Sequence, residues 1–145
     1  MAIFMNNHLL NNMQSNTAAT TLTSIAPWLS VQDGAKAVAF YKYAFSAVEV
    51  YRLEMPDGGL VVRLSVDGAE FWLSSEAPGQ ANPKPETLGG NSIRMILTVA
   101  DPDTLFAQAL KAGATQIFPV GEGHGWRLGR LADPFGLHWE IGRPL

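Results

Sequence analysis

Two segments of this chain recur in the same order at a constant spacing of 68 residues. Residues 29–33 (LSVQD) correspond to residues 97–101 (LTVAD), and residues 67–73 (DGAEFWL) correspond to residues 135–141 (FGLHWEI). Few of these residues are identical, but their structural roles match. In each half an alternating strand ends in an aspartate that can cap a helix, and a turn with glycine precedes a final strand. We therefore expect two modules with the same order of elements.

Composition limits the classes of function that this chain can have. The chain has 145 residues, of which 47% are hydrophobic, enough to bury a core in one domain or two small modules. Ten basic residues against thirteen acidic ones, without a basic run, argue against a nucleic-acid partner. The sequence has no cysteine, which excludes disulfides and thiolate metal sites and fits a cytoplasmic location. No apolar run approaches the length of a membrane span, so no membrane partner is expected.

The first half of the repeat predicts a strand, a helix and three further strands. Residues 25–31 alternate as a strand does, and Asp33 can cap a helix in which Val38, Tyr41 and Phe45 recur at helical spacing. Turn signals with glycine separate the strands that follow. These three strands are expected at residues 48–55, 60–66 and 69–75.

The second half repeats this order. Residues 93–99 read as a strand, and Asp101 and Gly113 are expected to begin and end a helix. Three more strands are expected at residues 115–120, 126–131 and 137–142. The predicted organisation is a flexible tail (1–23), a βαβββ module (24–76), a linker rich in proline and glycine (77–91) and a second βαβββ module (92–145). We predict an α+β fold with helices on one side of curved antiparallel sheets that surround a cavity.

Three short segments resemble a known superfamily. Residues 40–45 (FYKYAF), 125–127 (GWR) and especially 133–141 (DPFGLHWEI) are similar to the vicinal oxygen chelate superfamily, which contains glyoxalases, bleomycin-resistance proteins and extradiol dioxygenases. The likeness is strongest to its PhnB-like branch and covers about residues 24–144. It implies the glyoxalase/bleomycin-resistance-like fold and a homodimer, in which modules can be exchanged between subunits to complete each cavity.

The resemblance also places the usual metal ligands. In metal-dependent members one ligand comes from the first strand and one from the last strand of each module, and these positions fall here on Ala26, Trp72, Arg94 and Glu140. Only Glu140 offers a suitable donor, and the arginine is a permanent cation. We therefore expect neither the usual metal centre nor another cofactor.

His138 and Glu140 leave two alternatives open. Together with Glu70 they could form a displaced metal site, although side chains two apart on a strand diverge by nearly 7 Å at their bases. His138 could instead act as a general base that Glu140 or Glu70 orients. The catalytic residues, and whether the protein is an enzyme at all, are left open by the sequence.

The same strand alternation predicts an aromatic and charged cavity around Glu140. Tryptophan offers a stacking surface to a planar or cationic ligand, and arginine can hold a carboxylate or phosphate with two parallel hydrogen bonds. The predicted ligand-binding residues are Trp28, Arg63, Glu70, Trp72, Arg94, His138 and Glu140. The alternative is that both tryptophans fill a core and that Arg94 pairs with Glu140 in place of a metal.

Three functions are consistent with these features. The first, which we favour, is a metal-free protein that binds a small organic molecule, for sequestration or resistance. The second is an enzyme of the lyase, isomerase or dioxygenase type that uses a non-standard metal or a His/Glu acid–base pair. The third is a non-catalytic interaction subunit whose cavity has closed.

Overall fold

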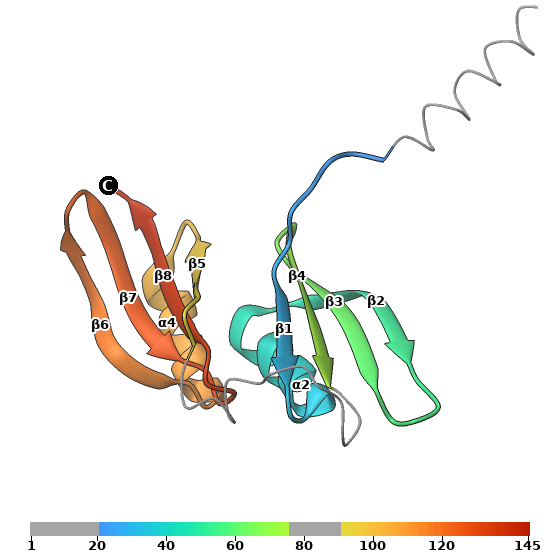
Figure 1. The fold of residues 1–145 in the computed structure, drawn as a ribbon. Helices are drawn as coiled ribbons and strands as arrows, with labels where there is room; N and C mark the ends of the chain where they lie inside the picture. Colours follow the sequence, from blue (N-terminus) through green and yellow to red (C-terminus); the bar gives the residue numbers. More distant parts are fainter. Residues whose placement is uncertain (1–20, 76–90) are drawn as a thin grey trace, which may run out of the picture.

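The computed structural model describes residues 21–75 and 91–145, which form two four-stranded sheets with one helix each (Figure 1). The first module contains β1 (Trp28–Val31), α2 (Gly34–Phe45), β2 (Val48–Glu54), β3 (Leu60–Val66) and β4 (Ala69–Ser75). The second contains β5 (Arg94–Thr98), α4 (Pro102–Ala112), β6 (Thr115–Gly123), β7 (Trp126–Ala132) and β8 (His138–Pro144). The predicted βαβββ order is confirmed in both halves. Nearly all of the predicted tail (1–23) and linker (77–91) lies outside the described residues.

Each sheet is mixed, whereas the sequence analysis predicted antiparallel sheets. The strand orders are β1-β4-β3-β2 and β5-β8-β7-β6, and β1 pairs in parallel with β4 as β5 does with β8. The three later strands of each module pair antiparallel through hairpins. The first strand differs because a helical crossover follows it, and a crossover lets the chain re-enter the sheet in the same direction. The sheets are curved and open, and within one chain they do not close around a cavity.

Both helices begin where the sequence predicts, and the second also ends where it predicts. The Asp33 carboxylate accepts from the backbone N–H of Lys36 at 3.0 Å, and the Asp101 carboxylate accepts from the N–H of Thr104 at 3.2 Å. Gly113 ends the second helix with a left-handed φ of 118°, a conformation that glycine adopts without a steric penalty. Neither helix of the described residues has the length and apolar content that a bilayer crossing needs. The cytoplasmic location stays a prediction from composition.

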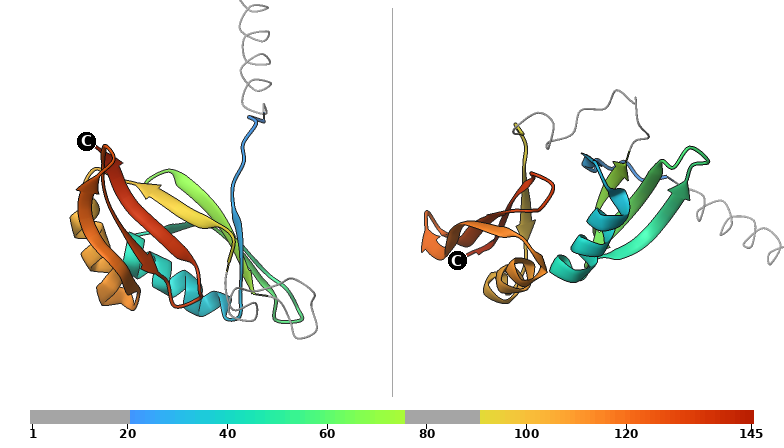
Figure 2. Two further views of the ribbon diagram at one scale, coloured as in Figure 1. Left: turned by 60° about the vertical axis from the view of Figure 1, so that its left-hand side comes forward. Right: turned by 90° about the horizontal axis from the view of Figure 1, so that it is seen from below.

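The helix-bearing faces of the two sheets turn toward each other (Figure 2). Helices α2 and α4 lie against each other, and the Gln108 side chain donates to the backbone carbonyl of Tyr43 at 2.9 Å. Phe71 of the first sheet and Trp139 of the second contact each other with ring centroids 5.5 Å apart. The core therefore lies between the sheets, and the opposite face of each sheet points out of the molecule. We call these outward faces the open faces.

One buried carboxylate joins the two modules. Asp133 is 5% exposed, and its Oδ1 accepts from the backbone N–H groups of Phe135 and Leu137 at 2.9 and 3.0 Å. Its Oδ2 accepts from the indole N–H of Trp139 at 2.9 Å and from the hydroxyl of Tyr41, in the helix of the other module, at 2.5 Å. Burial raises the pKa of Asp133, and the hydrogen bonds from Tyr41 and Trp139 oppose that rise. The aspartate of the DPFG motif therefore has a structural role.

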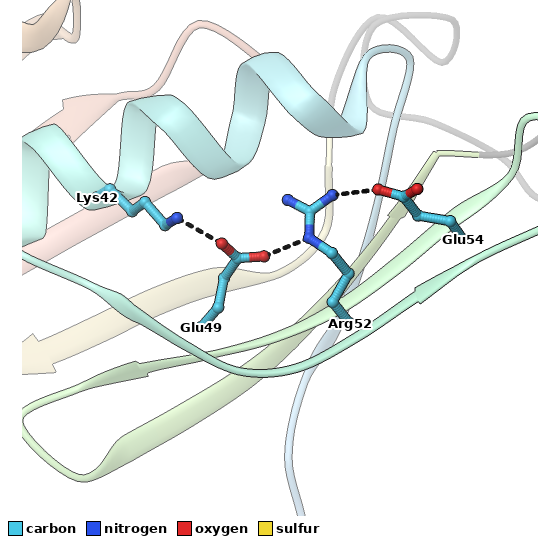
Figure 3. A network of polar contacts seen from close by, with 4 residues as sticks. All are labelled: Lys42, Glu49, Arg52 and Glu54. Carbon is cyan, nitrogen blue, oxygen red and sulfur yellow. Dashed lines mark hydrogen bonds and ion pairs between the residues drawn. The ribbon is translucent and has the colours of Figure 1, made fainter.

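An ionic chain ties the edge strand β2 to helix α2 (Figure 3). Lys42 donates to the Glu49 carboxylate, whose other oxygen accepts from Arg52 Nε at 2.6 Å, and Arg52 also contacts Glu54 at 2.9 Å. A bulge between Glu49 and Tyr51 makes this possible, because it places Glu49 and Arg52 on the same face although they are three residues apart. These hydrogen bonds lower the pKa of Glu49. The same bulge turns Tyr51 onto the open face.

Candidate functional site

Two stacked tryptophans stand on the open face of the first sheet. Strand alternation points Phe71 and Leu73 toward the core and Trp72 outward, and register pairs Trp72 with Trp28 on the neighbouring strand. The two indole planes are 10° from parallel, with centroids 5.6 Å apart. The indole N–H of Trp28 donates to Ser74 Oγ at 2.9 Å, which fixes the ring, yet Trp28 is 52% exposed. This pair forms a preordered aromatic surface.

Arg63 and Tyr51 hold Trp72 from its other side. The Arg63 guanidinium lies 5.2 Å from the ring centroid of Trp72, and Tyr51 contacts the same ring edge-on at 5.6 Å. Arg63 Nε lies 3.3 Å from Glu70 Oε2, in an orientation that does not form a hydrogen bond. The structure thus brings four predicted ligand-binding residues together on one face: Trp28, Arg63, Glu70 and Trp72.

Glu140 occupies the position on the open face of the second sheet that corresponds to Trp72 on the first sheet. Two arginines converge on it. Arg130 donates to Glu140 Oε1 from Nη2 at 2.6 Å and from Nε at 3.2 Å. Arg94 Nε lies 3.2 Å from the same oxygen. The Glu140 side chain is only 14% exposed, so its carboxylate is held by these two cations with little access to water. Arg94 therefore pairs with Glu140, as the sequence alternative proposed.

His138 lies on the same face as Glu140 but is not joined to it. Its register partners are Arg94 on β5 and Ala132 on β7. Within the described ranges the imidazole makes no hydrogen bond or ion pair, and the carboxylate of Glu140 is turned to the arginines instead. No carboxylate of the described residues therefore orients His138 for general-base work.

A small apolar pocket lies beside Glu140. Its volume is about 270 Å³, and Ile96, Trp126, Leu128, Glu140 and Gly142 line it. A Cβ on Gly142 would lie 2.5 Å from the Leu128 Cβ, so only glycine leaves room for Leu128 to lie against β8 at this position. A larger groove of about 880 Å³ lies at the start of α2, beside the hairpin between β2 and β3, and contains none of the predicted ligand-binding residues.

The four positions that the resemblance gives for metal ligands do not suit a divalent cation. Glu140 is the one carboxylate among them, and two guanidinium groups already surround it. Residues 21–75 and 91–145 contain no cluster of three or more histidine, cysteine, aspartate or glutamate side chains that could hold a metal ion. The proposed displaced set of Glu70, His138 and Glu140 is therefore not assembled within one chain. A cation would have to displace the arginines before it reached the glutamate oxygens.

The two groups of predicted residues lie on different sheets. Trp28, Arg63, Glu70 and Trp72 stand on the first open face, and the other three on the second. Among the described residues, no hydrogen bond, ion pair or ring contact joins the two faces. The single cavity that the sequence analysis expected is therefore not formed by these residues within one chain; they form two separate groups, one on each open face, which we call the half-sites.

Sequence reasoning missed two residues that the structure places in the second half-site. Arg130 bonds Glu140, and its guanidinium lies 5.2 Å from the ring centroid of Phe118. Register makes them the counterparts of Arg63 and Tyr51, at a spacing of 67 instead of 68 residues. The hairpin that contains Asp133 causes this shift of one position. Allowing for that longer turn in the repeat would have revealed an arginine and an aromatic residue at equivalent places in both halves.

Comparison with known proteins identifies the family. Residues 28–141 match the model of the glyoxalase-like domain. The chain belongs to this family and thereby to the vicinal oxygen chelate superfamily, which confirms the resemblance seen in the sequence. An uncharacterized protein of Mycobacterium tuberculosis (strain H37Rv) is 39% identical over an alignment 142 residues long, which covers 93% of this chain and 83% of that protein.

Solved structures show the same fold. The PhnB protein from Bacillus cereus superposes with a TM-score of 0.61 at 19% identity, covering 82% of this chain and 98% of that one. The genomically encoded fosfomycin resistance protein FosX from Listeria monocytogenes gives a TM-score of 0.66 at 14% identity, covering 87% and 96%. At these identities the likeness is one of fold, and the chemistry must be argued from the residues present.

Proposed function

We propose that this protein binds a small organic molecule on its open faces and holds it without a metal centre. The observation that carries this proposal is the Trp28–Trp72 stack, in which Trp28 is 52% exposed although its neighbours fix it. Exposed tryptophan on a sheet face is costly in water and marks a surface that something else covers. A planar organic ligand covers such a surface well, since both ring faces are apolar.

The stack is prepared for binding. Ser74 holds the Trp28 indole N–H, and Arg63 and Tyr51 hold the ring of Trp72. Side chains that are already ordered lose little conformational freedom when a ligand arrives, which increases affinity. The engagement of Glu140 by Arg130 and Arg94 argues against the enzymatic alternative, because it removes the carboxylate that would orient His138. Binding without turnover is therefore the function we favour.

We propose further that a second copy of the chain completes the site. Large apolar side chains on the open faces remain at least 38% exposed in one chain: Trp28, Tyr51, Leu53, Ile96 and Phe118. A two-fold symmetric pair can set the aromatic first face of one copy against the arginine-bearing second face of its partner, and it does so twice. The two half-sites would then form two equivalent cavities per dimer.

Sequestration or resistance is the role we propose for such binding. The fold neighbour FosX is named a fosfomycin resistance protein, which supports this role by analogy of fold. The third candidate, an interaction subunit, differs in one measurable respect. It predicts that the open faces bury each other in the dimer and leave no space for a small ligand.

Ligand binding is tested by titrating a panel of planar aromatic molecules and aromatic antibiotics while following intrinsic tryptophan fluorescence and heat. We expect at least one ligand to bind, and the variants Trp28→Leu and Trp72→Leu to weaken it by about tenfold or more. Tyr43→Leu is the control, since Tyr43 is 72% exposed on α2, away from the open faces. Equal weakening by Tyr43→Leu, or no binding across the panel, would contradict the proposal.

The dimer is tested by sedimentation equilibrium of the full chain. We expect a dimer that Trp28→Glu and Ile96→Glu each weaken, because both place an unpaired charge in the proposed interface. Tyr43→Glu should leave the dimer intact. A wild-type monomer that still binds the ligand would show that one open face suffices, and a dimer unaffected by either substitution would place the interface elsewhere.

A further inference from the structure

The charges on the two open faces do not balance. Arg63 stands beside Glu70 on the first face, whereas Arg94 and Arg130 share the single carboxylate Glu140 on the second. These five side chains leave one positive charge uncompensated, although the whole chain carries a formal net charge of −3. A site built from both faces is therefore locally cationic in an acidic protein.

Arg94 is the second of two cations that share one carboxylate, so a ligand can replace its ion pair without leaving Glu140 unpaired. Arg130 forms both hydrogen bonds that Glu140 Oε1 receives, while Arg94 only approaches that oxygen with Nε and forms no hydrogen bond within the described part of the chain. The Arg94 side chain is 54% exposed. No described residue forms a hydrogen bond with its Nη groups, and a guanidinium presents these groups in a geometry that matches a carboxylate.

The two carboxylates of the open faces are not in excess in this way: each already has an arginine partner, so a cationic ligand would have to compete with an arginine for it. Glu70 faces Arg63, and Glu140 faces two arginines. The cation position against Trp72 is already filled by the Arg63 guanidinium. What remains is the stacking surface of Trp28, which attracts an aromatic ring of any charge.

We infer that the ligand is an aromatic acid: a planar ring system that stacks on Trp28 and carries one carboxylate, which Arg94 binds. This inference rests on the proposed function and deepens it by naming the ligand class. In the proposed dimer Trp28 and Arg94 face the same cavity from different copies. The ring supplies most of the buried apolar area, and the carboxylate supplies selectivity over neutral and cationic aromatics.

The test compares three probes with the same ring: 2-naphthoate, the neutral 2-naphthamide and the cationic 2-naphthylmethylammonium. Isothermal titration calorimetry on the full chain should give 2-naphthoate an affinity about tenfold or more above that of the amide, the ammonium binding weakest. Arg94→Gln should reduce naphthoate affinity to that of the amide and leave the amide unchanged. Arg143→Gln is the matched control, because alternation places Arg143 on the same side of β8 as the core-facing Ile141, opposite to the open face. Trp28→Leu should weaken all three probes.

The outcomes separate the two claims. Equal or tighter binding of the amide or the ammonium, or an Arg94→Gln variant that keeps the preference for naphthoate, overturns the aromatic-acid inference and leaves the binding function standing. If none of the three probes binds and no other aromatic molecule does, the proposed function itself fails. Thermal melts of each variant confirm that the fold is retained, as expected for substitutions at exposed side chains.

Discussion

Tyr41 and Asp133, 92 positions apart in the sequence, share a buried hydrogen bond of 2.5 Å between the hydroxyl and Oδ2. Tyr41 is fully buried in the helix of the first module, and Asp133 begins the DPFG turn of the second. The bond therefore crosses the contact between the modules. Around it, Tyr41 contacts Phe135 and Trp139, with ring centroids 6.0 and 5.6 Å apart. The relative placement of the two open faces depends on this contact.

The variant Tyr41→Phe should destabilise the chain by about 1–3 kcal/mol, because a buried carboxylate loses one donor while the ring packing stays. Urea unfolding followed by tryptophan fluorescence measures this loss. Tyr43→Phe, which removes the hydroxyl of an exposed tyrosine on the same helix, should have no measurable effect. Equal stability of the two variants would show that the Tyr41–Asp133 bond contributes nothing to the contact.

The raised pKa of Asp133 predicts a pH dependence with a definite sign. Burial raises this pKa above its ordinary value of 3.8, so the folded protein keeps the proton to higher pH than the unfolded chain does. The contribution of Asp133 to the free energy of unfolding is therefore largest below pH 3.8 and falls as pH rises toward the raised value. Asp133→Asn lacks this titration, so its deficit in stability relative to wild type should shrink as pH rises.

Urea unfolding of both proteins across this pH interval gives the difference directly. Three other carboxylates have a lowered pKa: Glu49, Asp101 and Asp103. Their contributions to the free energy of unfolding fall on acidification in both proteins and therefore cancel from the comparison. A deficit that stays constant with pH would mean that the Asp133 pKa is the same in the folded and unfolded states.

Local patterns were sufficient to predict the elements of this fold. The strands at residues 60–66 and 69–75 have the predicted bounds, and both capping aspartates were found, because alternation and capping depend on neighbours in the sequence. The parallel pairing of β1 with β4 and of β5 with β8 was missed, since it depends on where the helical crossover returns the chain.

The site was predicted in part for the same reason. Alternation placed Trp28 and Trp72 correctly on one face, and the stack follows from their register. Arg130 was missed because the Asp133 turn displaces its strand by one position relative to the repeat. The separation into two half-sites could not be predicted either, because it depends on helix-to-helix packing between modules, which no local pattern encodes.

The protein purified without chelator should contain no stoichiometric divalent metal. Nickel, zinc, manganese and iron should leave its melting temperature unchanged, because the arginines around Glu140 repel a cation. Metal analysis measures the metal content, and a thermal-shift series measures the change in melting temperature. The control is Glu140→Gln, which removes the only carboxylate among the four positions where the family has its metal ligands. A bound metal that Glu140→Gln removes would mean that the arginines give way to a cation and that enzyme assays should follow.

Gly142→Ala should destabilise the chain by about 1–3 kcal/mol through overpacking. A Cβ there would lie 2.5 Å from the Leu128 Cβ and 2.7 Å from the backbone oxygen of Arg127, and backbone cannot move aside as a side chain does. Gly123→Ala is a matched control, because its Cβ would meet no atom within 4 Å and its φ is not in the left-handed region. Since Gly142 and Leu128 line the pocket beside Glu140, the alanine variant should also bind the aromatic ligand more weakly. Thermal unfolding and calorimetry of the two glycine variants test both effects, and equal stability would show that β7 shifts to accommodate the methyl group.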